Sequence, residues 1–341
     1  MRAIFKVICL VIIVMGLGSC EFDHLHYETN RTALVRIEID WSQTSVTPNG
    51  VSAYVFDDSG NKYCDMVLSS NPDRVDLTLA AGDYTVVLHH NSISELSNVG
   101  LSGSTTLNTF CISANENASE PTFTVEGDAQ KYVTEPGDVT SCTLRGIHVD
   151  NNDLQYHYYK PDLADYEQEV NYTYYATPRH VVHTARVIAH IDGLEYAAGA
   201  PVAILRGMSG GYNFGLESTT EEDVMEQFYV NTRVTRVEED GPTEIYVDYN
   251  TFGMHTIDSA NQVYYLDIRF ELLDGTYKYY HEDVSDNIRT EQTETQNLHI
   301  IELELEALPE TEGGGTGGED DEGAFDPSLD EWKDVEIVVP L

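Results

Sequence analysis

Apolar and polar residues alternate with a period of two along much of the chain. From Val35 to Trp41, the apolar residues 35, 37, 39 and 41 alternate with the charged residues 36, 38 and 40. This period places the apolar side chains on one face of a β-strand. Further strands are predicted at residues 51–56, 75–79, 84–89, 180–192, 201–206, 212–216, 243–252, 263–272 and 298–305. Short strands at such regular spacing indicate an all-β chain built from sandwiches.

A chain of 341 residues is long enough for about two domains. The tyrosine-rich stretch from Leu154 to Tyr166 interrupts the strand rhythm, so the two sandwiches are expected at residues 33–155 and 165–308. One short helix is expected near residues 220–227, because Ser218 or Thr219 can cap a first turn rich in acidic residues.

The N-terminus is typical of a lipoprotein signal peptide, residues 1–19. A basic start precedes the apolar run from Val7 to Leu17, which is shorter than the roughly 20 residues that a membrane-spanning helix needs. Small residues then precede Cys20. We therefore expect Cys20 to carry lipid and residues 20–32 to form a tether. Glu21 and Asp23 favour export to the outer face of the outer membrane.

The C-terminal part combines a glycine- and acid-rich linker, residues 309–326, with a strand-like segment, residues 327–341. One face of this segment is apolar, with Trp332, Val335, Ile337, Val339 and Leu341. An unpaired apolar strand is an aggregation hazard, so the segment is expected to pair with a sheet, either its own or that of a neighbour.

The charge of the chain excludes some partners. Acidic residues number 59 against 18 basic ones, which gives a net charge of −41. Such a surface repels nucleic acid and anionic lipid headgroups. A hydrophobic content of 41% and 22 tyrosines indicate a folded protein rather than a disordered one.

Three cysteines remain beyond Cys20, namely Cys64, Cys111 and Cys142. An odd number permits at most one disulfide, which we expect in the N-terminal half with its pairing left open. None of the three lies in a C-x-x-C or C-x-x-H pair, so the cysteines indicate neither a zinc site nor a redox motif.

No motif predicts catalysis, a metal or a cofactor. Gly207-Met208-Ser209-Gly210-Gly211 matches G-x-S-x-G, but a strand rather than a helix is predicted after it, so the glycines are expected to form a turn. The histidines lack a metal-binding spacing and are interpreted as packing or surface residues: His89, His90, His180, His183 and His190. The acids at 319–322 lack the order of a calcium loop and are assigned to the linker.

Several segments, taken in order, resemble the lipid-anchored members of the fimbrillin superfamily, and are similar to the anchor subunits of type V fimbriae. These segments are Leu17–Cys20, Leu79–Tyr84 with the strand ending at Asn91, Arg206–Gly211, Tyr249–Gly253 and Asp283–Asp286. The resemblance implies two transthyretin-like sandwiches, a lipid anchor in the outer membrane and a role in attaching a fimbrial polymer or limiting its length.

The resemblance also implies strand exchange between subunits. Polymerising relatives lose an N-terminal strand by cleavage after an arginine. Arg31 and Arg36 are present here, but a chain fixed by Cys20 would lose its anchor on such cleavage. This favours a terminal anchor, with residues 332–341 as the candidate donor strand.

A structural component of a fimbria or cell-adhesion assembly is therefore the predicted function, and its partners are a membrane, through the lipid, and fimbrial subunits. The alternative is a glycan-binding surface lipoprotein, because tyrosines cluster at residues 156–159 and 171–176. Ser259, in Asp258-Ser259-Ala260, fits a D-[ST]-A pattern for O-glycosylation.

Overall fold

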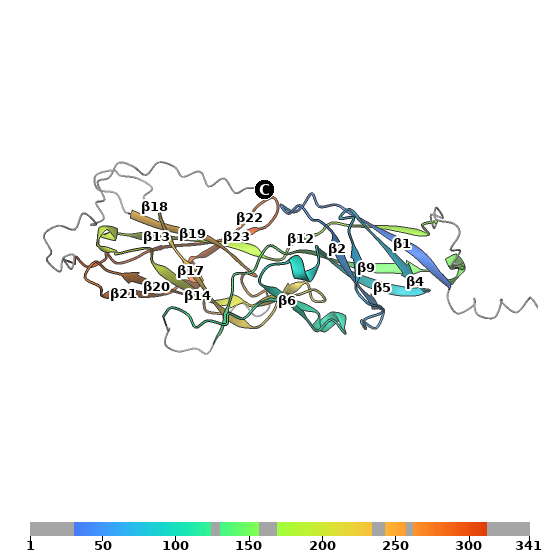
Figure 1. The fold of residues 1–341 in the computed structure, drawn as a ribbon, viewed down its shortest axis with the longest axis horizontal. Coiled ribbons are helices and arrows are strands. Elements are labelled where there is room, and N and C mark those ends of the chain that lie inside the picture. Colours follow the sequence, from blue (N-terminus) through green and yellow to red (C-terminus); the bar gives the residue numbers. More distant parts are fainter. Residues whose placement is uncertain (1–30, 124–129, 157–168, 234–242, 257–261, 312–341) are drawn as a thin grey trace, which may run out of the picture.

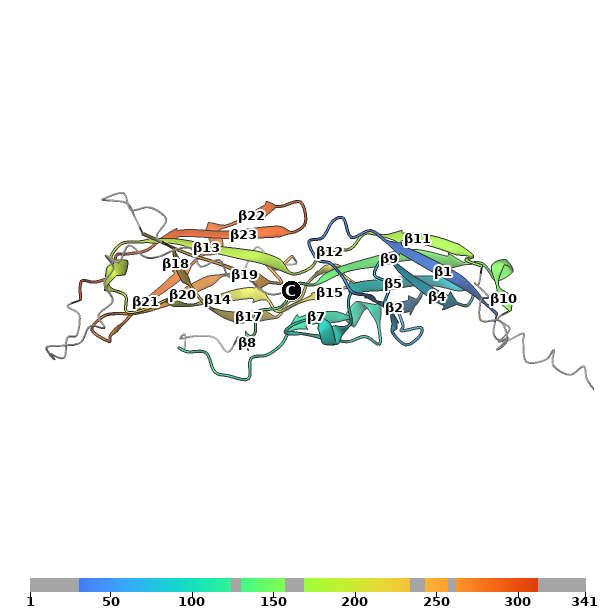
Figure 2. The ribbon, with the colours of Figure 1, turned by 45° about the horizontal axis from the view of Figure 1, so that its top comes forward.

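The chain forms an elongated all-β molecule of two β-sandwiches placed end to end (Figures 1 and 2). The computed structural model describes residues 31–123, 130–156, 169–233, 243–256 and 262–311. Within these ranges the helices are 3-10 turns of three residues each: η1 (Ile93–Glu95), η2 (Leu107–Thr109), η3 (Asn151–Asp153), η4 (Leu194–Tyr196) and η6 (Ser285–Asn287).

The first sandwich encloses one apolar core between two sheets. In one sheet, β1 (Arg31–Ile39) lies between the antiparallel β4 (Arg74–Leu79) and the parallel β11 (Tyr172–Ala176), and β10 (Gln155–Tyr156) pairs with the start of β1. The other sheet has the order β12-β9-β5-β2-β3. Its strands are β2 (Val51–Asp57), β3 (Val67–Ser69), β5 (Gly82–His90), β9 (Thr140–Val149) and β12 (Arg179–His180).

The second sandwich has the same plan. In one sheet, β13 (His183–Ile191) lies between the antiparallel β19 (Thr243–Thr251) and the parallel β23 (Asn297–Glu304), with β18 (Asn231–Arg233) and β22 (Ile288–Gln292) outside them. The facing sheet has the order β21-β20-β14-β17-β8. Its strands are β8 (Lys131–Val133), β14 (Val202–Ser209), β17 (Asp223–Tyr229), β20 (Tyr265–Glu271) and β21 (Tyr277–Asp283).

The two sandwiches are repeats of one arrangement, down to a matching ion pair. On β1, Arg36 faces its register partner Asp76 on β4, with Nε–Oδ1 and Nη2–Oδ2 distances of 2.8 and 3.0 Å. On β13, Arg186 faces Asp248 on β19 with both distances 2.8 Å. A bidentate arginine–aspartate ion pair thus lies at the equivalent position in each half.

A small middle sheet joins the halves. It has the order β16-β15-β7-β6, with β6 (Val99–Ser102) and β7 (Cys111–Ala114) from the first half, and β15 (Gly211–Asn213) and β16 (Ser218–Thr219) from the second. β8 also crosses over, since it pairs in parallel with β17. In the core beneath the middle sheet, Tyr54 and Phe56 from β2 pack in one cluster with Phe110 and Phe214.

The first sandwich continues further along the chain than the boundary at 155–165 expected from the sequence. β11 pairs with β1 and β12 pairs with β9, so the first sandwich extends to His180. The first sandwich also contributes β7 and β8 to pairings with the second, so the halves are joined by paired strands as well as by the connecting chain.

The helix expected near residues 220–227 is wrong, because strand β17 occupies this stretch. Val224 and Phe228 are four residues apart, a spacing that both a helix and a strand can place on one face. Pairing with β14 decides between them and turns Glu226, which lies between these two residues, into the interior as well.

The expected disulfide is also wrong, because Cys64, Cys111 and Cys142 are all free. Cys142 lies on β9 opposite Leu88, while Cys111 lies on β7 in the middle sheet. Burial raises the pKa of each thiol. The three cysteines therefore act as small, half-buried packing residues.

Candidate interaction surfaces

The described chain begins at one end of the rod, which we call the N-terminal pole (Figure 1). Here the start of β1 pairs with β10 beside the η3 turn. The backbone N–H of Leu34 donates to Asn171 Oδ1 at 2.8 Å, and the hydroxyl of Tyr172 donates to Asp153 Oδ2 at 2.5 Å. These bonds fix the direction in which the chain enters the first sandwich.

The described chain ends at the opposite end of the rod, the C-terminal pole. β23 runs parallel to β13 toward this pole, and beyond it Leu305 N and Leu308 N donate to His190 O and Asp192 O, each at 2.8 Å. Gly193 has φ +82°, and a Cβ there would lie 2.9 Å from Leu308 O. Glycine at 193 therefore lets the outgoing chain pack against the end of the sandwich.

The junction between the sandwiches is closely packed. A Cβ on Gly211 would lie 2.4 Å from the carbonyl oxygen of Ile112, and one on Gly215 would lie 2.2 Å from that of Leu107. From β9, Arg145 Nη2 also donates to Gly215 O at 2.6 Å. Such close approach of backbones holds the two halves in one orientation.

Histidines also lie at this junction and are uncharged at neutral pH. His90 Nδ1 is 3.0 Å from Thr140 Oγ1, and the rings of His183 and His299 have centroids 5.8 Å apart. Burial lowers the pKa of His89, His183 and His299 to about 4. The packing interpretation is confirmed for the buried His89, His90 and His180.

The G-x-S-x-G segment does not present a nucleophile. Ser209 is fully buried on β14, and its hydroxyl donates to the carbonyl oxygens of Gly211 and Thr220, both at 2.9 Å. Gly207 has φ +93° and marks a bulge in β14, where the pairing with β17 shifts register. No helix follows; Gly210 and Gly211 lead directly into β15, as the turn interpretation predicted.

A buried acid lies inside the second sandwich. Glu226 is 3% exposed, and neither carboxyl oxygen has a well-aligned hydrogen-bond partner among the described residues. Burial raises the pKa of Glu226 to about 8, outweighing the lowering by Thr251. The neighbouring Tyr249 hydroxyl is buried as well, and it too has no partner in the described part. Both groups are enclosed, so this pair has no route to a substrate.

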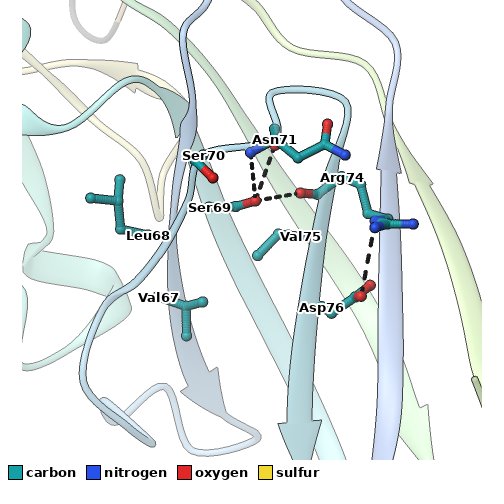
Figure 3. A pocket seen from close by; sticks show the side chains of 8 residues that line it. All are labelled: Val67, Leu68, Ser69, Ser70, Asn71, Arg74, Val75 and Asp76. Carbon is teal, nitrogen blue, oxygen red and sulfur yellow. Dashed lines mark hydrogen bonds and ion pairs between the residues drawn. The ribbon is translucent and has the colours of Figure 1, made fainter. Parts of the chain in front are cut away.

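A shallow surface pocket of about 300 Å³ lies between β3 and β4 (Figure 3). Ser69 Oγ donates to the carbonyl oxygens of Asn71 and Arg74 at 3.1 and 2.8 Å, and Arg74 lies 3.9 Å from Asp76. The polar groups that line the pocket thus bind one another and brace the turn between the strands.

Neither a metal centre nor a membrane helix is found in the described ranges. No three or more His, Cys, Asp or Glu side chains gather there in a way that could hold a metal ion. No helix there is long and apolar enough to cross a membrane. The predicted lipidation site Cys20, the glycosylation candidate Ser259 and the candidate donor strand at 332–341 lie outside the described residues.

One surface feature was missed from the sequence. Tyr277 and Tyr279 on β21 are 47% and 54% exposed on the outer face of their sheet, and Arg269 lies beside them. Tyrosine density along the sequence pointed instead to residues 156–159 and 171–176. The alternation of Tyr277, Lys278 and Tyr279 was the available signal, but it does not reveal the neighbouring arginine.

Three solved structures are similar to this chain, and the first of them shares its fold. A candidate adhesin from Bacteroides ovatus is 16% identical with a TM-score of 0.56, over 82% of this chain and 94% of that chain. The fimbrial anchor protein Mfa2 from Porphyromonas gingivalis is 13% identical with a TM-score of 0.49, over 80% and 90%. The tip fimbrial protein Mfa3 from the same organism, with a C-terminal truncation, is 12% identical with a TM-score of 0.29, over 74% and 81%.

The likeness to the Bacteroides ovatus structure shows a common all-β fold. No curated protein matches the chain. The family described as "Domain of unknown function (DUF5119)" matches residues 19–229, which is more than half of the chain. The chain therefore belongs to the DUF5119 family.

Proposed function

We propose that the chain is an outer-membrane lipoprotein that serves as a structural anchor component of a fimbria or another cell-adhesion assembly. Lipid on Cys20 holds the N-terminal pole at the membrane. Residues 332–341 donate a strand to a neighbouring subunit. The function is mechanical and needs no catalytic residue.

The placement of the two poles carries this proposal. The described chain enters at the start of β1 and leaves beyond the end of β23, at opposite ends of the rod (Figures 1 and 2). The segments before residue 31 and after residue 311 are therefore joined to opposite poles. This is the arrangement required of a link that is held at one end and binds its neighbour at the other.

The rigid junction supports the same function. Strands β7 and β8 of the first half pair with β15 and β17 of the second, so a pull along the rod acts on paired strands. The fold shared with the Bacteroides ovatus candidate adhesin is consistent with this assignment.

The linker gives the candidate strand enough reach. About 20 residues separate Thr311 from Trp332, and a flexible glycine-rich chain of that length spans roughly 25 Å on average. A strand on such a tether reaches the exposed sheet edge of a neighbouring subunit, and its alternate side chains would enter that neighbour's core.

Strand donation is tested by paired substitutions on the two faces of the segment. Affinity capture from solubilised outer membranes uses a tag inserted within residues 313–318. Ile337→Asp places a charge on the apolar face and is expected to abolish recovery of a fimbrillin-like partner. Val338→Asp places the same charge on the opposite face and is expected to retain recovery. Equal recovery with both variants would reject strand donation.

The lipid anchor is tested separately. Cys20→Ser is expected to prevent incorporation of radiolabelled palmitate and to release the protein from the outer-membrane fraction. Ser19→Ala keeps a small residue before the cysteine and should leave labelling unchanged. Palmitate labelling of the Cys20→Ser chain would contradict the assigned anchor.

A further inference from the structure

The outer face of the sheet β21-β20-β14-β17-β8 carries a cluster of aromatic rings around one arginine. Tyr277 and Tyr279 on β21 have ring centroids 6.3 Å apart. Phe123, which crosses over from the first half, lies 6.0 Å from Tyr279. Arg269 on β20 is the direct register partner of Tyr279, so a guanidinium and an exposed ring are side by side.

Arg269 is held in place by its neighbours. Its guanidinium carbon lies 5.2 Å from the Phe123 ring centroid and 4.9 Å from that of Tyr277. Nη1 donates to the carbonyl oxygen of Thr122 at 2.9 Å. Two ring contacts and one hydrogen bond fix the plane of the guanidinium, which reduces the entropy that a ligand must remove on binding.

Arg269 has no acidic partner in the described part of the chain, although the chain contains 59 acidic residues. Outward-facing Arg36 and Arg186 each form a two-pronged pair with an aspartate. On the same face, Arg206 pairs with Asp267 at 2.8 Å. Among these described arginines, Arg269 is the one whose remaining N–H donors are left for a group from outside.

We propose that this cluster binds a saccharide that carries a carboxylate, such as a uronic or sialic acid. The carboxylate accepts hydrogen bonds from Arg269, whose planar fork matches its two oxygens. The sugar ring lies against Tyr279, whose exposed face accepts its C–H groups. A strongly acidic protein repels polyanions. A sugar with a single carboxylate and a C–H face therefore suits the site better than an acidic peptide with several charges.

The position of the cluster makes it accessible on an anchored protein. β20 and β21 lie in the half of the rod farthest from the start of β1 (Figures 1 and 2). If the N-terminal pole is held at the membrane, this face lies away from it. Saccharide binding adds a ligand-binding activity to the proposed structural role and does not depend on strand donation.

The test measures binding of glucuronate and N-acetylneuraminate to the full-length protein in detergent by calorimetry. Glucose and acetate serve as probes of the ring alone and the charge alone. We expect the acidic sugars to bind weakly, with dissociation constants up to about 50 mM. Glucose and acetate should each bind at least tenfold more weakly. Absence of acidic-sugar binding in this range, or equal binding of acetate, would overturn the proposal.

Substitutions locate the site. Arg269→Gln and Tyr279→Leu are each expected to weaken glucuronate binding about tenfold. Glu271→Gln removes the acid two residues along β20 on the same face and is expected to strengthen binding about twofold. Arg179→Gln and Tyr175→Leu, at exposed positions on the first sandwich, are matched controls that should not change binding. Unchanged binding in a folded Arg269→Gln protein would place the site elsewhere.

Discussion

At the residue scale, Glu226 makes the stability of the folded protein depend on pH. Burial raises its pKa to about 8 from an ordinary value of 4.5, so the folded state holds the proton more tightly than the unfolded state. Its contribution to stability is complete below about pH 4.5 and is lost as the pH rises toward 8, at no more than about 1.4 kcal/mol per pH unit.

Glu226→Gln removes this titration. The variant is therefore expected to gain stability over the native protein by an amount that grows between about pH 5 and pH 8. Urea unfolding at several pH values measures the difference. Glu304→Gln, at an exposed position of β23, is the matched control for loss of an acid. A constant difference for Glu226→Gln would show that this carboxyl is not held neutral.

The junction histidines act in the opposite direction. Burial lowers the pKa of His89, His183 and His299 to about 4, below the ordinary value of 6.5. The unfolded state binds their protons first, so stability is complete above about pH 6.5 and falls as the pH drops toward 4.

Because the histidines lose this stability on acidification, the melting temperature should already fall between about pH 6.5 and 5, where few carboxylates titrate. In urea unfolding over the same range, His183→Asn should reduce the slope of the free energy of unfolding against pH by up to about 1.4 kcal/mol per pH unit. His148→Asn is the comparison at an exposed histidine: that side chain is 59% exposed on the first sandwich, with Nδ1 2.7 Å from Asp83 Oδ1. A slope that both variants leave unchanged would mean that the junction histidines do not titrate in this range.

At the element scale, the close approach of β15 to β7 predicts a strong response to a side chain. Gly211→Val places atoms against the carbonyl of Ile112 and is expected to destabilise the protein by roughly 3 kcal/mol or more. Gly199→Ala has open space around its new Cβ and should cost little. Urea unfolding compares the two. A small effect of Gly211→Val would show that the middle sheet adjusts easily.

Strands with a clear period of two could be predicted from the sequence. β1, β4 and β13 keep apolar residues on one face, and this local signal survives folding. β7 and β8 are short and pair with strands far along the chain, so no local pattern reveals their partners. β17 was missed because tertiary pairing overrode a helix-compatible spacing.

The candidate sites, too, could be predicted from the sequence only where the signal is local. Exposed tyrosines on β21 follow from the alternation of that strand. Their neighbours Arg269 and Phe123 come from distant segments, so only the folded chain shows the cluster. The free cysteines could not be assigned from the sequence, because a disulfide depends on distances between strands.

At the scale of the whole molecule, two copies of one sandwich plan form a rod with the incoming and outgoing chain at opposite poles. The repeated pairs Arg36–Asp76 and Arg186–Asp248 show how closely the halves match. Strands β7 and β8 of the first half pair with strands of the second and so join the two halves. This geometry fits the proposed role of a link between a membrane and a neighbouring subunit.

The most direct test of this account is photo-crosslinking in cells from a crosslinking amino acid placed at position 337. Strand donation should give a covalent product with a second polypeptide of the fimbrillin type, and no such product from the same amino acid placed at the exposed position 304. Crosslinks from position 337 that form only within the same chain would contradict strand donation and show that residues 332–341 complete their own subunit.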